Sequence, residues 1–176
     1  MKFIETPLEG SFVIEIEKNE DNRGFFARTF DKKSFIKLNL ETELFQCNVS
    51  FNKKSGTLRG MHYQKHPYEE IKIVRCTKGK IFDVIIDLRI DSNSYKKWFG
   101  IELTAENHKM VYVPKGFAHG FLTLEDESEV FYQMSDCYMP DSASGIHWND
   151  DSIGIKWPRT PSVISSQDDS YSSQTP

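Results

Sequence analysis

Residues 80–88 read KIFDVIIDL, and their strict alternation indicates the class of fold. Because side chains along a β-strand point alternately to its two faces, this stretch divides into an apolar set and a mixed set. The apolar face carries Phe82, Val84, Ile86 and Leu88, and the other face carries Ile81, Asp83, Ile85 and Asp87. Two carboxylates on the mixed face predict that it is wet or lines a cavity.

Stretches on either side repeat this pattern. Residues 71–76, IKIVRC, place Lys72, Val74 and Cys76 on one side. Residues 129–138, EVFYQMSDCY, likewise group Val130, Tyr132, Met134, Asp136 and Tyr138. Turns are predicted at 21–24, at 114–116 and, as a hairpin, at 78–79. Many short strands predict an all-β fold, a double-sheet sandwich or jelly roll.

Composition bounds the classes of protein that fit. A chain of 176 residues predicts a single domain over 1–176, and 13 Phe with 7 Tyr favour strands. A net charge of −4 argues against nucleic acid as a partner. No apolar run reaches membrane length, no secretory signal is visible at the N-terminus, and Cys47, Cys76 and Cys137 fit no metal spacing. We therefore expect a cytoplasmic protein without a membrane partner.

Two segments do not follow the strand pattern. Residues 31–38 predict a short helix with Asp31 as N-cap and with Phe35 and Leu38 facing inward. Residues 162–176 are polar and rich in serine, and by themselves they predict a loose tail.

The densest group of reactive side chains is residues 57–64, TLRGMHYQ. If a hairpin is centred on Pro67, His62 and Lys72 lie directly opposite each other and share one face. Taken alone, the two side chains fit a solvated surface better than a site.

A second group, PKGFAHGF at 114–121, holds His119 among aromatic residues and glycines. Alone it fits a structural histidine as well as a functional one. Metal-binding jelly rolls share this pattern, but they usually add a His-x-His pair and an acid upstream. Here Gly60 and Gln64 flank His62 at the two-residue offsets, so the sequence predicts no metal site. Asp83 could support either histidine or serve as a buried structural acid.

Several motifs together resemble the dTDP-4-dehydrorhamnose 3,5-epimerase family from about residue 2 to residue 169. They are DNRGFF at 21–26, QCNVS at 46–50, LRGMHYQ at 58–64, Lys72, GKIFDVIIDLR at 79–89, VPKGFAHGF at 113–121, GIHWND at 145–150 and IKWP at 155–158. The spacing of LRGMHYQ and PKGFAHGF makes the resemblance highly specific.

The resemblance implies a cupin-like jelly-roll barrel with a few short helices, forming a homodimer by sharing strands. It implies His62 as the proton-abstracting base, oriented by Asp168 of the tail, and Tyr132 as the acid on the opposite face. Lys72 would stabilise the enolate, with His119 beside it. Further positions that resemble substrate contacts are Arg23, Arg28, Gln46, Asn48, Arg59, Tyr138 and Gln167.

The chemistry of the residues agrees with this resemblance. A ketone at sugar carbon 4 acidifies the hydrogens on carbons 3 and 5, because removing either one yields an enolate. A neutral histidine suits the proton transfer, and a fixed cation suits the enolate oxygen. The expected substrate is a nucleoside-diphosphate 4-keto-6-deoxy sugar of a rhamnose-like surface-glycan pathway, such as O-antigen or capsule, and no cofactor is expected.

Three positions depart from the usual family pattern. Arg28 and Ala143 stand where the family commonly has Glu, and Gln167 stands where it has Lys. Several alternatives therefore stay open: a CDP- or GDP-linked or longer sugar, inversion of carbon 3 or 5 alone, a metal-dependent cupin oxygenase, and a non-catalytic sugar-nucleotide binding module.

Overall fold

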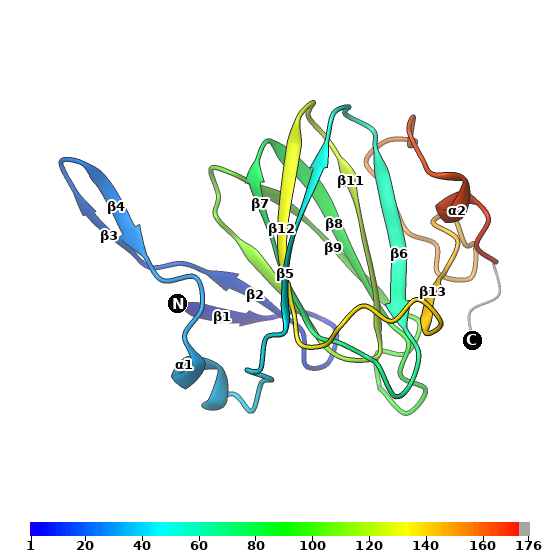
Figure 1. Cartoon of the computed structure of the whole chain (residues 1–176), viewed down its shortest axis with the longest axis horizontal. Coiled ribbons are helices and arrows are strands. Elements are labelled where there is room, and N and C mark those ends of the chain that lie inside the picture. The colour runs from blue at the N-terminus through cyan, green and yellow to red at the C-terminus, as the bar shows by residue number, and fades with distance from the viewer. Residues whose placement is uncertain (173–176) are drawn as a thin grey trace.

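The structure, a computed structural model that describes residues 1–172, consists of two facing antiparallel sheets with a projecting hairpin (Figure 1). The six-stranded sheet runs β1 (Lys2–Glu5), β2 (Phe12–Glu15), β10 (Met110–Val113), β7 (Lys72–Lys78), β12 (Ser128–Met134) and β5 (Gln46–Asn52). The five-stranded sheet runs β13 (Ala143–Gly145), β6 (Leu58–Gln64), β11 (Phe117–Thr123), β8 (Lys80–Asp87) and β9 (Trp98–Thr104). The hairpin is β3 (Lys18–Asp21) with β4 (Gly24–Ala27).

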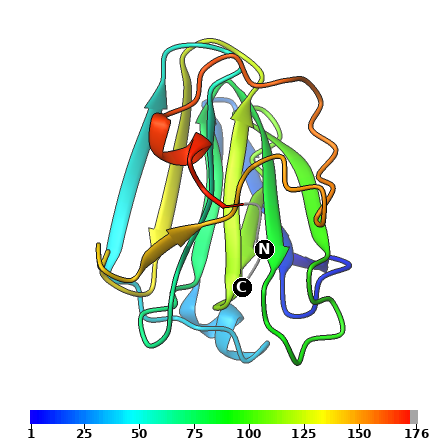
Figure 2. The ribbon, with the colours of Figure 1, turned by 90° about the vertical axis from the view of Figure 1, so that its right-hand side faces the viewer.

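This architecture confirms the predicted all-β jelly-roll sandwich. Figure 2 shows the two sheets from the side. The short helices are α1 (Lys32–Ile36) and α2 (Ser166–Asp169). Within residues 1–172, no helix has the length and apolar character needed to cross a membrane.

The strand over 80–88 is buried on both faces. Ile81 and Ile85 belong to the core between the sheets, whereas Val84 and Ile86 pack behind the five-stranded sheet under residues 146–157. The prediction of a wet or cavity-lining face was wrong, because Asp83 and Asp87 are almost fully buried and hydrogen-bonded. Residues 146–157 cover the outer face of β8, and the six-stranded sheet covers its inner face, whereas the alternation of side chains alone suggested that one face was exposed.

The predicted hairpin at 78–79 was also wrong. β7 and β8 lie in different sheets, so the chain crosses the sandwich at Gly79, whose φ is +72°. The turn at Asp21–Gly24 is confirmed, since β3 pairs with β4 through these two residues.

The predicted helix is present but shorter. Asp31 accepts a hydrogen bond from the Lys33 backbone N–H as N-cap, and Phe35 is fully buried. Leu38 does not face inward: the helix ends at Ile36 and Leu38 is 40% exposed.

Candidate active site

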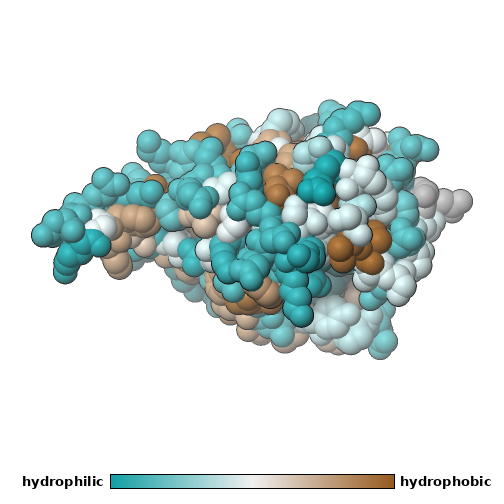
Figure 3. Space-filling view, turned by 90° about the horizontal axis from the view of Figure 1, so that it is seen from above, coloured by the Kyte–Doolittle hydropathy of each residue, from teal (hydrophilic) through white to brown (hydrophobic). Residues whose placement is uncertain are grey.

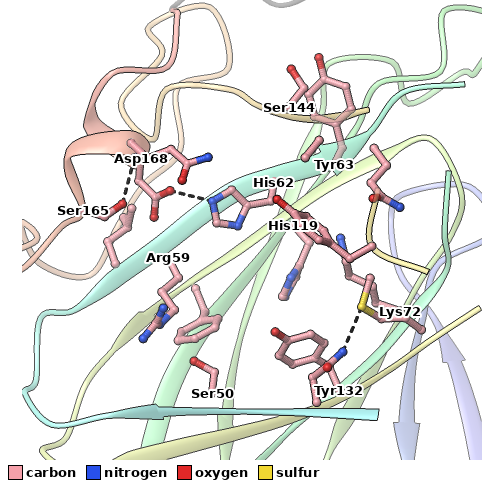
Figure 4. Close-up of a pocket in the computed structure, with 18 of the residues that line it drawn as sticks. Ser50, Arg59, His62, Tyr63, Lys72, His119, Tyr132, Ser144, Ser165 and Asp168 are labelled. Atoms are coloured by element: carbon pink, nitrogen blue, oxygen red, sulfur yellow. Dashed lines mark hydrogen bonds and ion pairs between the residues drawn. The ribbon is translucent and has the colours of Figure 1, made fainter. Parts of the chain in front are cut away.

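A cavity of about 800 Å³ opens between the two sheets, and its wall combines residues from distant parts of the chain (Figure 4). It is lined by ten of the twelve predicted site residues: Gln46, Asn48, Arg59, His62, Lys72, His119, Tyr132, Tyr138, Gln167 and Asp168. The sequence motifs thus converge on one compartment.

His62 and Asp168 form a pair at the edge of this cavity. His62 Nε2 lies 2.7 Å from Asp168 Oδ1, and the second carboxylate oxygen accepts from the Gly60 backbone N–H at 3.3 Å. Asp168 is buried, whereas the His62 side chain is 44% exposed. The carboxylate is enclosed and the imidazole remains accessible from the cavity.

The net pKa of Asp168 lies below the ordinary aspartate value. Burial is the largest influence and raises it, but the His62 hydrogen bond and charge, together with the Gly60 N–H and Ser165, outweigh burial. Asp168 is therefore ionised at neutral pH.

The segment after residue 162 is not a loose tail where the structure describes it. Ser165 caps α2 by accepting from the Asp168 backbone N–H at 3.0 Å, and the Leu58 N–H donates to the Val163 carbonyl at 2.9 Å. These contacts hold the segment beside β6 and place Asp168 against His62. Residues 173–176 of the predicted tail lie outside the described residues.

His119 forms a second histidine–carboxylate pair. It lies opposite His62 in the β6–β11 register, and its Nε2 lies 2.8 Å from Asp83 Oδ2. Both partners are buried. Of the two interpretations left open for Asp83, the structure places this acid on His119.

Tyr132 approaches from the other sheet. It lies on β12, between β7 and β5, and Figure 4 shows its ring on the opposite side of the cavity from His62. Burial raises the pKa of the phenol, and the charge of Arg59 partly offsets this effect. The hydroxyl is therefore protonated at neutral pH.

Lys72 also comes from the six-stranded sheet, which corrects the expected geometry. The predicted hairpin around Pro67 does not form, because β6 pairs with β11 and β13 while β7 pairs with β10 and β12. His62 and Lys72 share the cavity by facing each other across the sandwich. Their common site depends on sheet packing and not on strand pairing.

Polar side chains around the rest of the cavity are held by specific contacts. Gln46 Oε1 accepts from the Tyr138 backbone N–H at 3.0 Å, and Arg59 Nε donates to Asn52 Oδ1 at 2.7 Å. Tyr138 follows the end of β12 and is 57% exposed. Gln46 and Tyr138 lie at one end of the cavity and Arg59 at the other, because Gln46 and Asn52 are the first and last residues of β5.

Arg23 and Arg28 are the two predicted site residues that this chain does not bring to its own cavity. Arg23 lies in the turn of the projecting hairpin, with its side chain 85% exposed and paired with Asp21 at 2.6 Å. Arg28 pairs with Asp31 at 3.4 Å. The hairpin extends away from the barrel, so neither cation serves the site of the same chain (Figure 1).

Sequence reasoning missed several residues of the cavity wall, among them Glu70 and Tyr171. Glu70 is buried beside Lys72. The Tyr171 ring lies 5.9 Å from the His62 ring, in a place that a side chain at Gly145 would occupy. Glu70 directly precedes a strongly apolar strand, which was the available signal; nothing local distinguishes Tyr171.

The arrangement of the cavity side chains also bears on the alternative of a metal-dependent cupin oxygenase. Among residues 1–172, no cluster of three or more His, Cys, Asp or Glu side chains is arranged to hold a metal ion. Each cavity histidine instead directs Nε2 to a single carboxylate.

Comparisons with known proteins agree on one family. The family model described as dTDP-4-dehydrorhamnose 3,5-epimerase matches residues 5–175. The enzyme of that name from Methanothermobacter thermautotrophicus is 44% identical over 89% of this chain and 84% of its own length.

Solved structures show the same similarity. The Bacillus anthracis enzyme, with TDP and PPi bound, has a TM-score of 0.93 at 40% identity and covers 97% of this chain and 98% of its own. The Legionella pneumophila enzyme, in complex with dTDP-4-keto-L-rhamnose, has a TM-score of 0.88 at 35% identity and covers 95% and 89%. Sequence, motif spacing and fold therefore place this chain in the dTDP-4-dehydrorhamnose 3,5-epimerase family.

Proposed function

We propose that this epimerase inverts carbons 3 and 5 of a dTDP-linked 4-keto-6-deoxy sugar by proton transfer between opposite faces of the ring. The observation that carries the proposal is that His62, paired with Asp168 of α2, lies on one sheet while Tyr132 lies on the facing sheet of the same cavity. The relatives solved with TDP and with dTDP-4-keto-L-rhamnose support this substrate class.

The first step is removal of a proton next to the ketone. With Asp168 accepting the Nε2 proton, Nδ1 is left as the basic nitrogen of His62. The carboxylate fixes this tautomer and stabilises the imidazolium that forms, as in other His–Asp pairs. The C–H electron pair moves into the ring C–C bond, and the carbonyl becomes an enolate.

The enolate oxygen needs a fixed positive partner. Lys72 and His119 lie in the same cavity, and a preorganised donor in a site shielded from water stabilises developing charge strongly. We assign the ammonium of Lys72 to the enolate oxygen, with the ring of His119, held by Asp83, beside it.

The second step returns a proton from the opposite face. The raised phenol pKa keeps Tyr132 protonated until the enolate forms, and its O–H then donates to the carbon. His62 ends protonated and Tyr132 ends as phenolate, so exchange with solvent must restore both before the next inversion.

Recognition of the nucleotide and sugar is assigned to the polar side chains along the cavity wall. Gln46, Asn48, Arg59, Tyr138 and Gln167 supply donors, acceptors and one aromatic face there. Ala143 and Gln167, which depart from the usual family residues, also line this cavity. These substitutions concern recognition, so dTDP, UDP, CDP and GDP should be compared by thermal shift, with dTDP expected to stabilise the protein most.

We further propose that the active form is a homodimer in which the β3–β4 hairpin of each chain reaches the partner. The hairpin forms a separate arm in Figure 3, and Phe26 on it is 70% exposed. β5 is a free sheet edge whose outward residues Val49 and Phe51 are 58% and 46% exposed. A second copy covering these apolar groups would bring Arg23 and Arg28 to the partner's cavity.

We also propose that residues 1–176 act as one epimerase domain in the cytoplasm, in the synthesis of a deoxysugar for a surface glycan. Support for the compartment comes from Cys47, Cys76 and Cys137, which are all free thiols.

Incubation of the 4-keto substrate in deuterated water tests the reaction. Two deuterons should enter the sugar, at carbons 3 and 5, as counted by NMR. One deuteron would indicate inversion of a single carbon. Binding without exchange would indicate a non-catalytic module, and exchange lost to a chelator would favour metal-dependent chemistry.

A further inference from the structure

A buried carboxylate accompanies Lys72. Glu70 precedes β7 by two residues, and its Oε1 lies 2.8 Å from Lys72 Nζ. The side chains are 3% and 10% exposed, so this ion pair is shielded from water on the wall of the cavity. Glu70 plays no part in the proton transfers described above.

A third residue holds Glu70 from the opposite sheet. Gln64 Nε2 donates to Glu70 Oε2 at 2.9 Å, and also contacts the backbone carbonyls of Tyr68 and Cys137 at 2.8 and 3.2 Å. Its Oε1 accepts from the Met139 N–H at 2.6 Å. Both the nitrogen and the oxygen of the Gln64 amide are therefore hydrogen-bonded. Both oxygens of the Glu70 carboxylate also have a partner, Lys72 for Oε1 and Gln64 for Oε2.

This chain of contacts links the two halves of the catalytic apparatus. His62 and Gln64 are two residues apart on β6 and share a face of that strand, whereas Lys72 begins β7 in the other sheet. No backbone pairing joins β6 to β7. The contacts Gln64–Glu70–Lys72 are thus a direct side-chain connection between the strand of the base and the strand of the cation.

We propose that Glu70 is a positioning residue that sets the place of the Lys72 ammonium relative to His62 and the substrate ketone; this inference rests on the proposed epimerase function. Lysine has a flexible four-carbon stem, so its charge needs an external restraint to act at one point. Glu70 occupies one of the three N–H donors of Lys72 and leaves two for oxygen atoms of the substrate.

If Glu70 acted on Lys72 through its charge alone, removing Glu70 would change the rate in the opposite direction from the one that a positioning role predicts. A carboxylate beside the ammonium repels the developing enolate, so removing Glu70 would accelerate enolisation if the charge of Lys72 were all that mattered. If position matters, removal slows enolisation, because a displacement of about 1 Å can cost about 100-fold in rate. The sign of the change in kcat separates the two roles.

The experiment uses the full chain and measures kcat, KM and deuterium incorporation for Glu70→Ala and Glu70→Gln. We expect Glu70→Ala to lower kcat about 100-fold with KM changed less than about threefold. Glu70→Gln keeps an oxygen that accepts from Lys72 but turns an N–H toward Gln64, so it should retain more than a tenth of the activity. Glu69→Ala is the matched control, since Glu69 pairs with the exposed His66 at 3.4 Å and does not line the cavity described above, and it should behave as the unmodified enzyme.

A double-mutant cycle tests whether Glu70 acts through Lys72. In the Lys72→Met background neither Glu70 substitution should lower the remaining exchange rate further. An equal loss in both backgrounds would show a general structural role and overturn the proposal, as would a kcat for Glu70→Ala equal to or above that of the unmodified enzyme. If Glu70→Ala does not fold, the same test is made by comparing the effect of Glu70→Gln in the unmodified enzyme with its effect in Lys72→Met. Absence of exchange in the unmodified enzyme would instead contradict the proposed function.

Discussion

His62 Nε2 lies 2.7 Å from Asp168 Oδ1, although 106 residues separate the two along the chain. The carboxylate belongs to a short helix after the last strand, and the imidazole belongs to β6. Because Asp168 is buried and ionised, it can hold the imidazole in one tautomer and stabilise its protonated form.

Replacing Asp168 by Asn should lower kcat by about 100- to 10,000-fold with little change in fold, because an amide can turn its NH₂ toward the ring and favour the wrong tautomer. The rate is measured as deuterium incorporation under saturating substrate. Asp169→Asn is the matched control, since Asp169 has a 60% exposed side chain and lies 3.9 Å from His147. Equal effects of the two substitutions would contradict the assigned role of Asp168.

Removing the base should abolish exchange at both carbons. His62→Ala removes the group assigned to accept the proton, so we expect a loss of more than about 1,000-fold while the circular dichroism spectrum is preserved. His66→Ala, at an exposed histidine four residues along, should have no effect. Normal epimerisation by His62→Ala would show that another residue is the base.

Tyr132→Phe should separate the two steps of the reaction. The phenyl ring fills the same space but cannot donate a proton, so inversion should fall more than the initial removal of hydrogen. Loss of deuterium from a substrate labelled at carbon 3 or 5, compared with formation of inverted product by NMR, measures the two steps. If both fall by the same factor, Tyr132 is not the proton donor.

Asp87 should make the stability of the fold depend on pH. Burial raises its pKa, but hydrogen bonds from Arg89, Ser92 and Ser94 outweigh burial and lower the pKa from 3.8 to about 2. A depressed folded-state pKa contributes stability that is complete above the unfolded value and is lost as the pH falls through the folded value.

The measurable consequence is a difference between Asp87→Asn and the unmodified protein. The lowering of the Asp87 pKa from 3.8 to about 2 corresponds to about 2.5 kcal/mol, which the variant should lose in its free energy of unfolding at pH 7. The difference should shrink as the pH falls from about 4 toward 2, as measured by urea unfolding. A difference that does not change with pH would assign the effect to packing.

Val49→Asp should convert the proposed dimer to a monomer. It places a charge on the exposed outward face of β5, where burial against a second copy would be costly. Sedimentation velocity measures the change.

Arg23→Ala tests whether the hairpin contributes to the active site of the partner chain. It should leave the dimer intact and raise KM about tenfold if the hairpin serves the partner's cavity. An unmodified protein that sediments as a monomer would contradict the shared site.

Several elements could be predicted because their signal is local. The alternation at 80–88 requires a strand, Asp31 begins a helix by capping it, and the turn at 21–24 closes a two-stranded hairpin. The two histidine motifs, LRGMHYQ and PKGFAHGF, identified the family because each motif is a short continuous stretch of sequence.

Other features depend on contacts that no local pattern contains. The burial of Asp83 and Asp87 follows from layers packed on both faces of β8. The alternation of side chains along a strand is the same whether its partner is the next strand or a distant one, so sequence alone suggested a hairpin between His62 and Lys72.

From the sequence alone the chain could be identified as a β-rich member of the epimerase family, and a histidine base and a lysine cation could be predicted, because its motifs and their spacing resemble those of the family. The tertiary structure decided that these two groups face each other across a sandwich, that Glu70 and Gln64 connect them, and that Arg23 lies outside the cavity of its own chain. The physical reason is that strand pairing and burial depend on contacts between residues far apart in the sequence. Which residues meet is decided where the chain passes from one sheet to the other, as it does between β6 and β7 and between β7 and β8.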